Sequence, residues 1–144
     1  LRDELQTLIF QRRLTDKVML KGVSNNIFEE YLNASIFVLP SYFEGFGIVV
    51  IEAQQAGLPC VAFQSCNGPN DLISDGVNGF LVDDSQPDLA ITGLADKLRL
   101  LMSNESLRIE MGDKGRLHSH AYFQSSIIDQ WESLIKAVHR KGIS

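Results

Sequence analysis

The feature that most constrains the fold is a series of short, wholly apolar runs that alternate with helical patterns. Three runs of strand length cover residues 36–39, 60–63 and 80–82. A strand that is apolar at every position is buried on both faces, which is typical of a parallel sheet with helices on each side. The alternation therefore predicts an α/β fold with a doubly wound parallel sheet.

Helical patterns fill the segments between and after these runs. Asn25 or Asn26 can cap a helix that continues to Asn33, and Ser85, with Pro87 in the first turn, can start another. The remaining helical patterns span residues 5–13, 47–56, 105–117 and 125–139. The second of these is expected to stop at Gly57, and the last carries an apolar stripe. The sheet is therefore expected to be followed by carboxyl-terminal helices.

A fourth strand is predicted at residues 18–20, just before Gly22. Four strands are fewer than a doubly wound domain usually contains. Because the sequence opens directly on a helical pattern, we expect that one or two strands of the sheet precede it. The 144 residues are thus interpreted as one amino-terminally truncated α/β domain.

Charge and hydropathy exclude some classes of partner and some cellular locations. A formal charge of −5 without clustered Lys or Arg argues against nucleic acid as a partner. No run approaches the ~18 apolar residues of a membrane span, and the first residues do not resemble a secretory signal, so we expect a cytoplasmic protein. Cys60 and Cys66 are interpreted as reduced thiols, and the three histidines as surface residues.

The candidate ligand site is a glycine loop between the strand at 36–39 and the helix at 47–56. In open parallel sheets, ligands bind beyond the carboxyl ends of the strands, where a helix amino terminus offers unpaired N–H groups and partial positive charge. Gly45 and Gly47 remove side chains that would hold phosphate oxygens away, and glycine can adopt positive φ angles. The loop is therefore predicted to cradle a diphosphate.

Glu44 and Glu52 flank this loop, with seven residues between them. Glu52 can lean back toward the mouth of the site and accept hydrogen bonds from a ribose diol. Glu44 is placed for sugar hydroxyls or for positive charge at an anomeric carbon. The alternative is that Glu44 only stabilises the helix dipole and Glu52 is a surface residue. For Glu52 the apolar neighbours oppose that alternative, because an unpartnered carboxylate there is costly.

Residues 43–53 resemble the glutamate-pair signature of the family 4 glycosyltransferases. Three further blocks resemble the same family in the same order, at residues 18–22, 67–73 and 75–82, and the resemblance implies that residues 67–73 form a loop. The resemblance covers nearly the whole chain. It implies the Rossmann-like, carboxyl-terminal donor-binding domain of a retaining enzyme with the two-domain GT-B fold, so residues 1–144 are interpreted as a piece of that domain.

The resemblance also implies roles for individual residues. Glu52 would hold the ribose, Glu44 would be the catalytic residue at the transferred sugar, and Val23 and Ser24 would line the base. The diphosphate would lie against the loop and the first helical turn, formed by Gly45, Phe46, Gly47, Ile48 and Val49. No metal ion or other cofactor is expected.

The implied reaction is transfer of a hexose or N-acetylhexosamine from a nucleotide-diphosphate sugar, with uridine as the favoured base, to a glycan or lipid-linked acceptor in bacterial capsule, lipopolysaccharide or glycan synthesis. An acceptor domain outside this sequence would complete the active site and could bring the protein to the inner face of the cell membrane. Two alternatives stay open: a non-catalytic module that binds nucleotide sugars, and a sugar-nucleotide epimerase of GT-B fold.

Overall fold

The computed structural model describes residues 1–140 and contains one parallel sheet of three strands. The strands are β1 (Phe37–Leu39), β2 (Cys60–Phe63) and β3 (Gly79–Val82), in the order β1-β2-β3. Val61 of β2 lies opposite Val38 of β1 and Phe80 of β3. The three wholly apolar runs therefore form the predicted parallel sheet.

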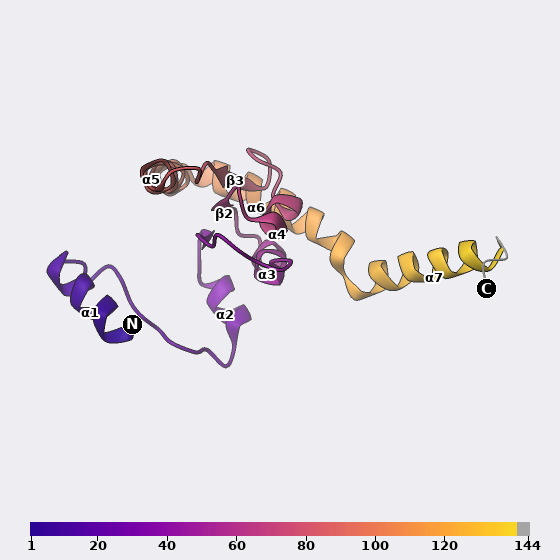
Figure 1. Ribbon diagram of the computed structural model, residues 1–144, viewed down its shortest axis with the longest axis horizontal. Helices are drawn as coiled ribbons and strands as arrows, with labels where there is room; N and C mark the ends of the chain where they lie inside the picture. Colours follow the sequence, from indigo (N-terminus) through magenta and orange to yellow (C-terminus); the bar gives the residue numbers. More distant parts are fainter. Residues whose placement is uncertain (141–144) are drawn as a thin grey trace.

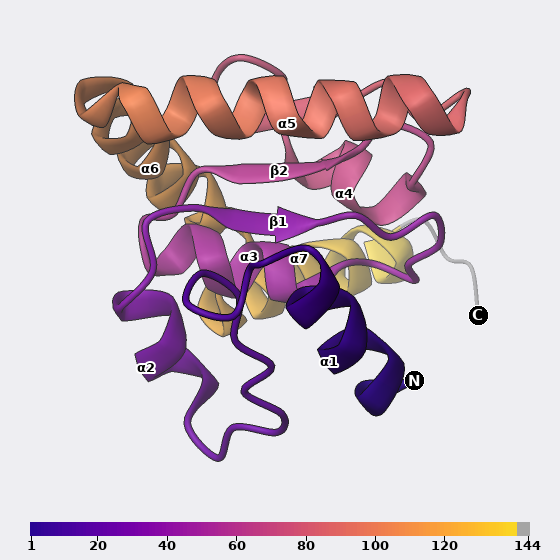
Figure 2. The ribbon, with the colours of Figure 1, turned by 90° about the vertical axis from the view of Figure 1, so that its left-hand side faces the viewer.

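Seven α-helices and one 3-10 helix surround or extend this sheet within the described residues. They are α1 (Arg2–Gln11), α2 (Ile27–Leu32), α3 (Ile48–Gln55), α4 (Asn67–Leu72), α5 (Pro87–Ser103), α6 (Glu105–Ser119), η1 (His120–Tyr122) and α7 (Gln124–Arg140). Figure 2 shows α5 running along one side of the strands and α3 along the other.

Successive residues of β2 point into different cores. Cys60 and Ala62 belong to the cluster shared with α2 and α3, whereas Val61 and Phe63 belong to the cluster shared with α5 and α6. This period of two is the side-chain alternation of a strand, and both of its faces are covered by helices. The doubly wound α/β fold is confirmed.

Helix α6 packs closely on α3 through glycine. A Cβ atom added to Gly112 would overlap the carbonyl oxygen of Gly57, and one added to Gly115 would lie 3.2 Å from Cγ of Gln54. Gln54 is fully buried, and its Nε2 donates to the carbonyl oxygen of Leu72 at 2.8 Å. Helix α3 is thus fixed against α6 and the end of α4, which sets the position of the loop before it.

The first and last helices extend away from the sheet. Figure 1 shows α1 and α7 at opposite ends of the molecule. The apolar stripe predicted for the last helix lies largely exposed on α7, with Trp131 at 61% and Ile135 at 62% exposure. No helix among residues 1–140 is long and apolar enough to cross a membrane.

Three local predictions are wrong. Residues 18–20 form no strand, because Val18 and Met19 are exposed and no neighbouring strand supplies a hydrogen-bonding partner. Ser85 does not cap α5: its N–H donates to Asp83 at 2.9 Å, and Gln86 occupies the N-cap position without a side-chain bond. Residues 67–73, expected as a loop, begin with helix α4, whose first turn tolerates a proline.

Candidate functional site

The predicted ligand loop lies at the carboxyl end of the sheet. Strand β1 ends at Leu39, residues 40–47 form the loop, and α3 begins at Ile48. Figure 2 shows the loop after β1 and the helix α4 after β2 at this same end of the strands. The sequence therefore brings a helix amino terminus to the edge where parallel sheets bind ligands.

Gly47 determines how α3 begins. It is buried, lies at the N-cap position with φ of 80°, and provides no side-chain cap for the helix. Helix amides in the first turn have no intrahelical acceptor, so the N–H groups of Ile48 and Val49 are left for another partner. The N–H of Val50 donates to the carbonyl oxygen of Gly47 at 2.8 Å. Positive φ is thus confirmed at Gly47.

Gly45 differs from Gly47, because its φ is not in the left-handed region. A Cβ atom added to Gly45 would have no heavy atom within 4 Å. The backbone there does not require glycine for conformation or for intrachain packing. Its missing side chain leaves open space at this point of the loop before α3.

The start of α4 packs against the backbone of the glycine loop. A Cβ atom on Gly68 would lie 2.6 Å from the carbonyl carbon and oxygen of Phe46. Pro69 lies beside Gly47, with its Cδ 3.5 Å from a Cβ built there. The ring of Phe46 meets Tyr122 edge to face, with centroids 5.9 Å apart. The loop backbone is therefore held from two sides.

Glu44 is half-buried in the loop and lies near the N-cap residue of α4, Cys66. Burial raises the pKa of the Cys66 thiol, and the negative charge of Glu44 raises it further. Cys66 is therefore a neutral neighbour of Glu44. The thiol was not a sequence-based candidate, and a single cysteine offers no signal that would place it beside the loop.

Glu52 has a partner inside the chain that the sequence did not indicate. The hydroxyl of Tyr31 donates to Oε2 of Glu52 at 3.1 Å. Burial, then the bond to Glu52 and its charge, raise the pKa of Tyr31 to about 12. Glu52 therefore has a partner within the protein as well as the predicted ligand, and one hydroxyl satisfies only part of a carboxylate.

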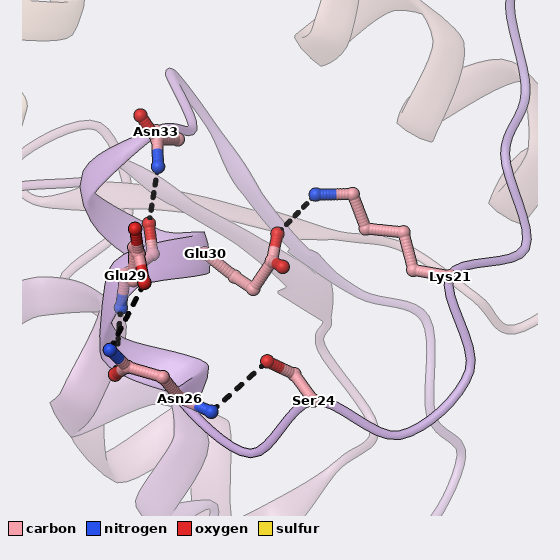
Figure 3. A network of polar contacts seen from close by, with 6 residues as sticks. All are labelled: Lys21, Ser24, Asn26, Glu29, Glu30 and Asn33. Carbon is pink, nitrogen blue, oxygen red and sulfur yellow. Dashed lines mark hydrogen bonds and ion pairs between the residues drawn. The ribbon is translucent and has the colours of Figure 1, made fainter.

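Val23 and Ser24 lie on a different segment from the glycine loop. Val23 is 97% exposed, and Figure 2 shows the segment before α2 apart from the loop that follows β1. Figure 3 shows how this segment is held: Ser24 Oγ accepts from the N–H of Asn26 at 3.2 Å, and Lys21 pairs with Glu30. The role of Val23 and Ser24 at the base stays a prediction.

Asn26 is the N-cap of α2, which confirms one of the two predicted positions. Its side-chain oxygen accepts from the N–H of Glu29 at 3.4 Å, and its Nδ2 donates to the Glu29 carboxylate at 3.1 Å. Figure 3 shows this cap and the bond from Asn33 to the Glu29 carbonyl at the other end. The short helix that carries Tyr31 is therefore capped at both ends.

Other features of the surface do not coincide with the predicted site. A hollow of about 430 Å³ is lined by residues of α1 and the turn after it, none of which is a predicted site residue. Within residues 1–140, no group of three or more His, Cys, Asp or Glu side chains is arranged to hold a metal ion. Independence from metal stays a prediction.

The comparison with known proteins identifies relatives that match most of the chain. The family described as "Glycosyl transferases group 1" matches residues 1–118. The capsular polysaccharide biosynthesis glycosyltransferase CapM of Staphylococcus aureus is 35% identical over 126 residues, which are 88% of this chain and 31% of CapM. The chain spans about a third or less of the length of the curated relatives that it matches.

Solved structures agree on the fold. The pneumococcal O-GlcNAc transferase GtfA, solved in complex with UDP and GlcNAc, superposes with a TM-score of 0.81 at 25% identity over 94% of this chain and 27% of GtfA. The carboxyl-terminal domain of LpcC from Francisella tularensis, a glycosyl transferase group 1 protein, gives a TM-score of 0.69 at 27% identity over 83% of this chain and 60% of that domain. With this architecture and a family match over most of its length, the chain belongs to the group 1 glycosyltransferases.

Proposed function

We propose that the protein containing this chain transfers a hexose or N-acetylhexosamine from a uridine-diphosphate sugar to a glycan or lipid-linked acceptor in bacterial surface-polysaccharide synthesis. The chain supplies the donor-binding part of the active site. CapM is a capsule glycosyltransferase, and GtfA was solved with UDP and GlcNAc. These relatives support the donor class and the kind of product.

The uncapped amino terminus of α3 is the observation that carries the proposal. Gly47 offers no side-chain cap, and the missing Cβ of Gly45 leaves open space in the loop that precedes the helix. A diphosphate placed there would accept from the N–H groups of Ile48 and Val49 and lie in the positive field of the helix dipole. A neutral ligand would gain less from that field than a diphosphate.

The two glutamates then take different parts of the donor. Glu52 lies about one turn into α3, where its carboxylate would accept from the ribose hydroxyls. Glu44 precedes the diphosphate cradle, where its charge would stabilise the positive charge that develops as the glycosidic bond breaks. We assign the protein on this basis to family 4, with retention of anomeric configuration. The segment 21–26, with Val23 and Ser24, would contact the base.

The remaining parts of the proposal concern groups outside the cradle. The α3 amides, rather than a metal ion, would offset the diphosphate charge. The acceptor would bind on a domain that this chain does not contain, and contact of that domain with the cytoplasmic face of the membrane would bring the enzyme to lipid-linked acceptors. The chain by itself would bind donor without completing a turnover.

A donor panel on the intact protein tests the reaction. Uridine, guanosine and adenosine diphosphate sugars are supplied separately, and sugar release and transfer are measured with and without a chelator. We expect transfer from uridine-diphosphate sugars, unchanged by the chelator. Transfer from another nucleotide sugar alone would contradict the uridine assignment, and binding without release or transfer from any donor would support the non-catalytic alternative.

The role of Glu52 is tested by binding. Glu52→Ala should weaken UDP binding by about tenfold or more, because a hydrogen bond to a charged group contributes about 1.5–3 kcal/mol. Isothermal titration of wild type and variant with UDP measures this difference. Equal affinities would remove Glu52 from the ribose.

A further inference from the structure

Tyr31 is the buried residue of α2. Its hydroxyl group makes a hydrogen bond to Glu52 that is separate from the packing of its ring. The side chain is 6% exposed and belongs to the core that α2 shares with α3. Its ring meets Phe37 of β1 edge to face, with centroids 5.8 Å apart. Phenylalanine would satisfy this packing. The hydroxyl is directed to Oε2 of Glu52 at 3.1 Å.

The Tyr31 hydroxyl bonds to Oε2 of Glu52 and leaves the other carboxylate oxygen, Oε1, without a side-chain partner among the described residues. Within residues 1–140, Glu52 receives its one side-chain hydrogen bond on Oε2, from Tyr31. Within these residues no fully buried side-chain oxygen or nitrogen lacks a partner, so Oε1 of Glu52 is not fully buried. The hydroxyl therefore fixes the carboxylate at one oxygen while the other can accept from a ligand.

Tyr31 remains a donor throughout the neutral range. Its pKa is raised to about 12 by burial, by the bond to Glu52 and by the charge of Glu52. A phenol that stays protonated can only present its hydrogen to the carboxylate, so the direction of this bond does not change with pH near neutrality. The orientation of Glu52 is therefore maintained before any ligand arrives.

We propose that Tyr31 is a positioning residue that orients the Glu52 carboxylate toward the ribose diol of the nucleotide. This inference rests on the proposed function of Glu52. Glu52 is otherwise a flexible side chain, and ordering it on binding would reduce affinity. Because α2 is capped at Asn26 and tied to the segment 21–26 by the Lys21–Glu30 pair, the same short helix also links the predicted base-contacting segment to Glu52.

The test is a double-mutant cycle on the intact protein, with UDP and 2′,3′-dideoxy-UDP as probes. Tyr31→Phe keeps the ring and should lower UDP affinity by about threefold to tenfold, with a smaller loss for the dideoxy nucleotide. In the Glu52→Ala background, Tyr31→Phe should change UDP affinity by less than about twofold. Ser103→Ala is the control, since it removes a hydroxyl that donates within α5, to the carbonyl oxygen of Arg99 at 2.8 Å, and UDP affinity should be unchanged.

The outcomes distinguish a failure of the ribose role of Glu52 from a failure of the positioning role of Tyr31. If Glu52→Ala leaves UDP binding unchanged, the assignment of Glu52 to the ribose fails. If Glu52→Ala weakens binding but Tyr31→Phe does not, that assignment stands and the positioning role is overturned. An equal effect of Tyr31→Phe with and without Glu52, or an equal loss for both nucleotides, also overturns it. Thermal melting of each variant shows that the folded protein is compared, and ultraviolet titration of the phenol should show a lower Tyr31 pKa in Glu52→Gln.

Discussion

Gly68→Ala should displace the glycine loop by pushing against the backbone of Phe46, while Gly68 itself is not a predicted ligand-binding residue. A methyl group at Gly68 would lie 2.6 Å from the carbonyl carbon and oxygen of Phe46 and 2.9 Å from its Cα. An ordinary contact begins at 3.4 Å, so the two backbones must separate by about 0.8 Å. The atoms that collide are backbone, which cannot move aside as a flexible side chain would.

The expected loss of stability is about 1–3 kcal/mol, the usual cost of overpacking, measured by denaturant unfolding. UDP affinity should fall by about tenfold, because the first-turn amides of α3 move with Phe46 and Gly47. Gly45→Ala is the matched control: its methyl meets nothing within 4 Å, so stability should stay within about 0.5 kcal/mol while UDP binding weakens. A folded Gly68→Ala protein with wild-type UDP affinity would refute the placement of the diphosphate.

Three further predictions concern packing, pH and turnover. Gly112→Ala should destabilise the protein by about 1–3 kcal/mol, because its methyl overlaps the Gly57 carbonyl, whereas the exposed Ser106→Ala should be neutral in the same unfolding assay. Burial raises the pKa of Cys60 from 9.0 to about 12, so the thiol ionises at lower pH in the unfolded protein than in the folded protein. The free energy of unfolding should therefore fall as pH rises from about 9 toward 12, and it should fall less in Cys60→Ala. Parallel pH profiles of wild type and variant would contradict this. Glu44→Gln should lower kcat by about 10²–10³ with UDP affinity changed less than about threefold, and normal kcat would remove its catalytic role.

The parts of the fold that the sequence predicted well are those where one face or both faces of an element are buried. The runs at 60–63 and 80–82 are apolar because helices cover both sides of the sheet, and the structure confirms them as β2 and β3. Helix α3 was predicted from its glycine start and its stop at Gly57, which has φ of 81°. Burial favours apolar residues and positive φ favours glycine, so both can be predicted from the sequence.

The wrong predictions fall where a local pattern depends on a distant partner. Residues 18–20 have the composition of a strand, but a strand also requires a neighbour for its N–H and C=O groups, and nothing in the segment itself supplies one. Residues 67–72 contain glycine, proline and asparagine, which favour a turn. They form α4 because Pro69 lies in the first turn and Leu72 is buried against α3.

The site shows the same division between local and distant information. Glu44, Gly47 and Glu52 could be proposed as site residues from sequence because a loop and one helix carry all three. Tyr31 could not, since it lies 21 positions before Glu52 and a tyrosine on a short amphipathic helix is ordinarily a core residue. Its ring is a core residue here as well. Only the direction of the hydroxyl distinguishes it, and that direction depends on how α2 packs against α3, so the residue that we propose orients Glu52 becomes visible only when the two helices are brought together.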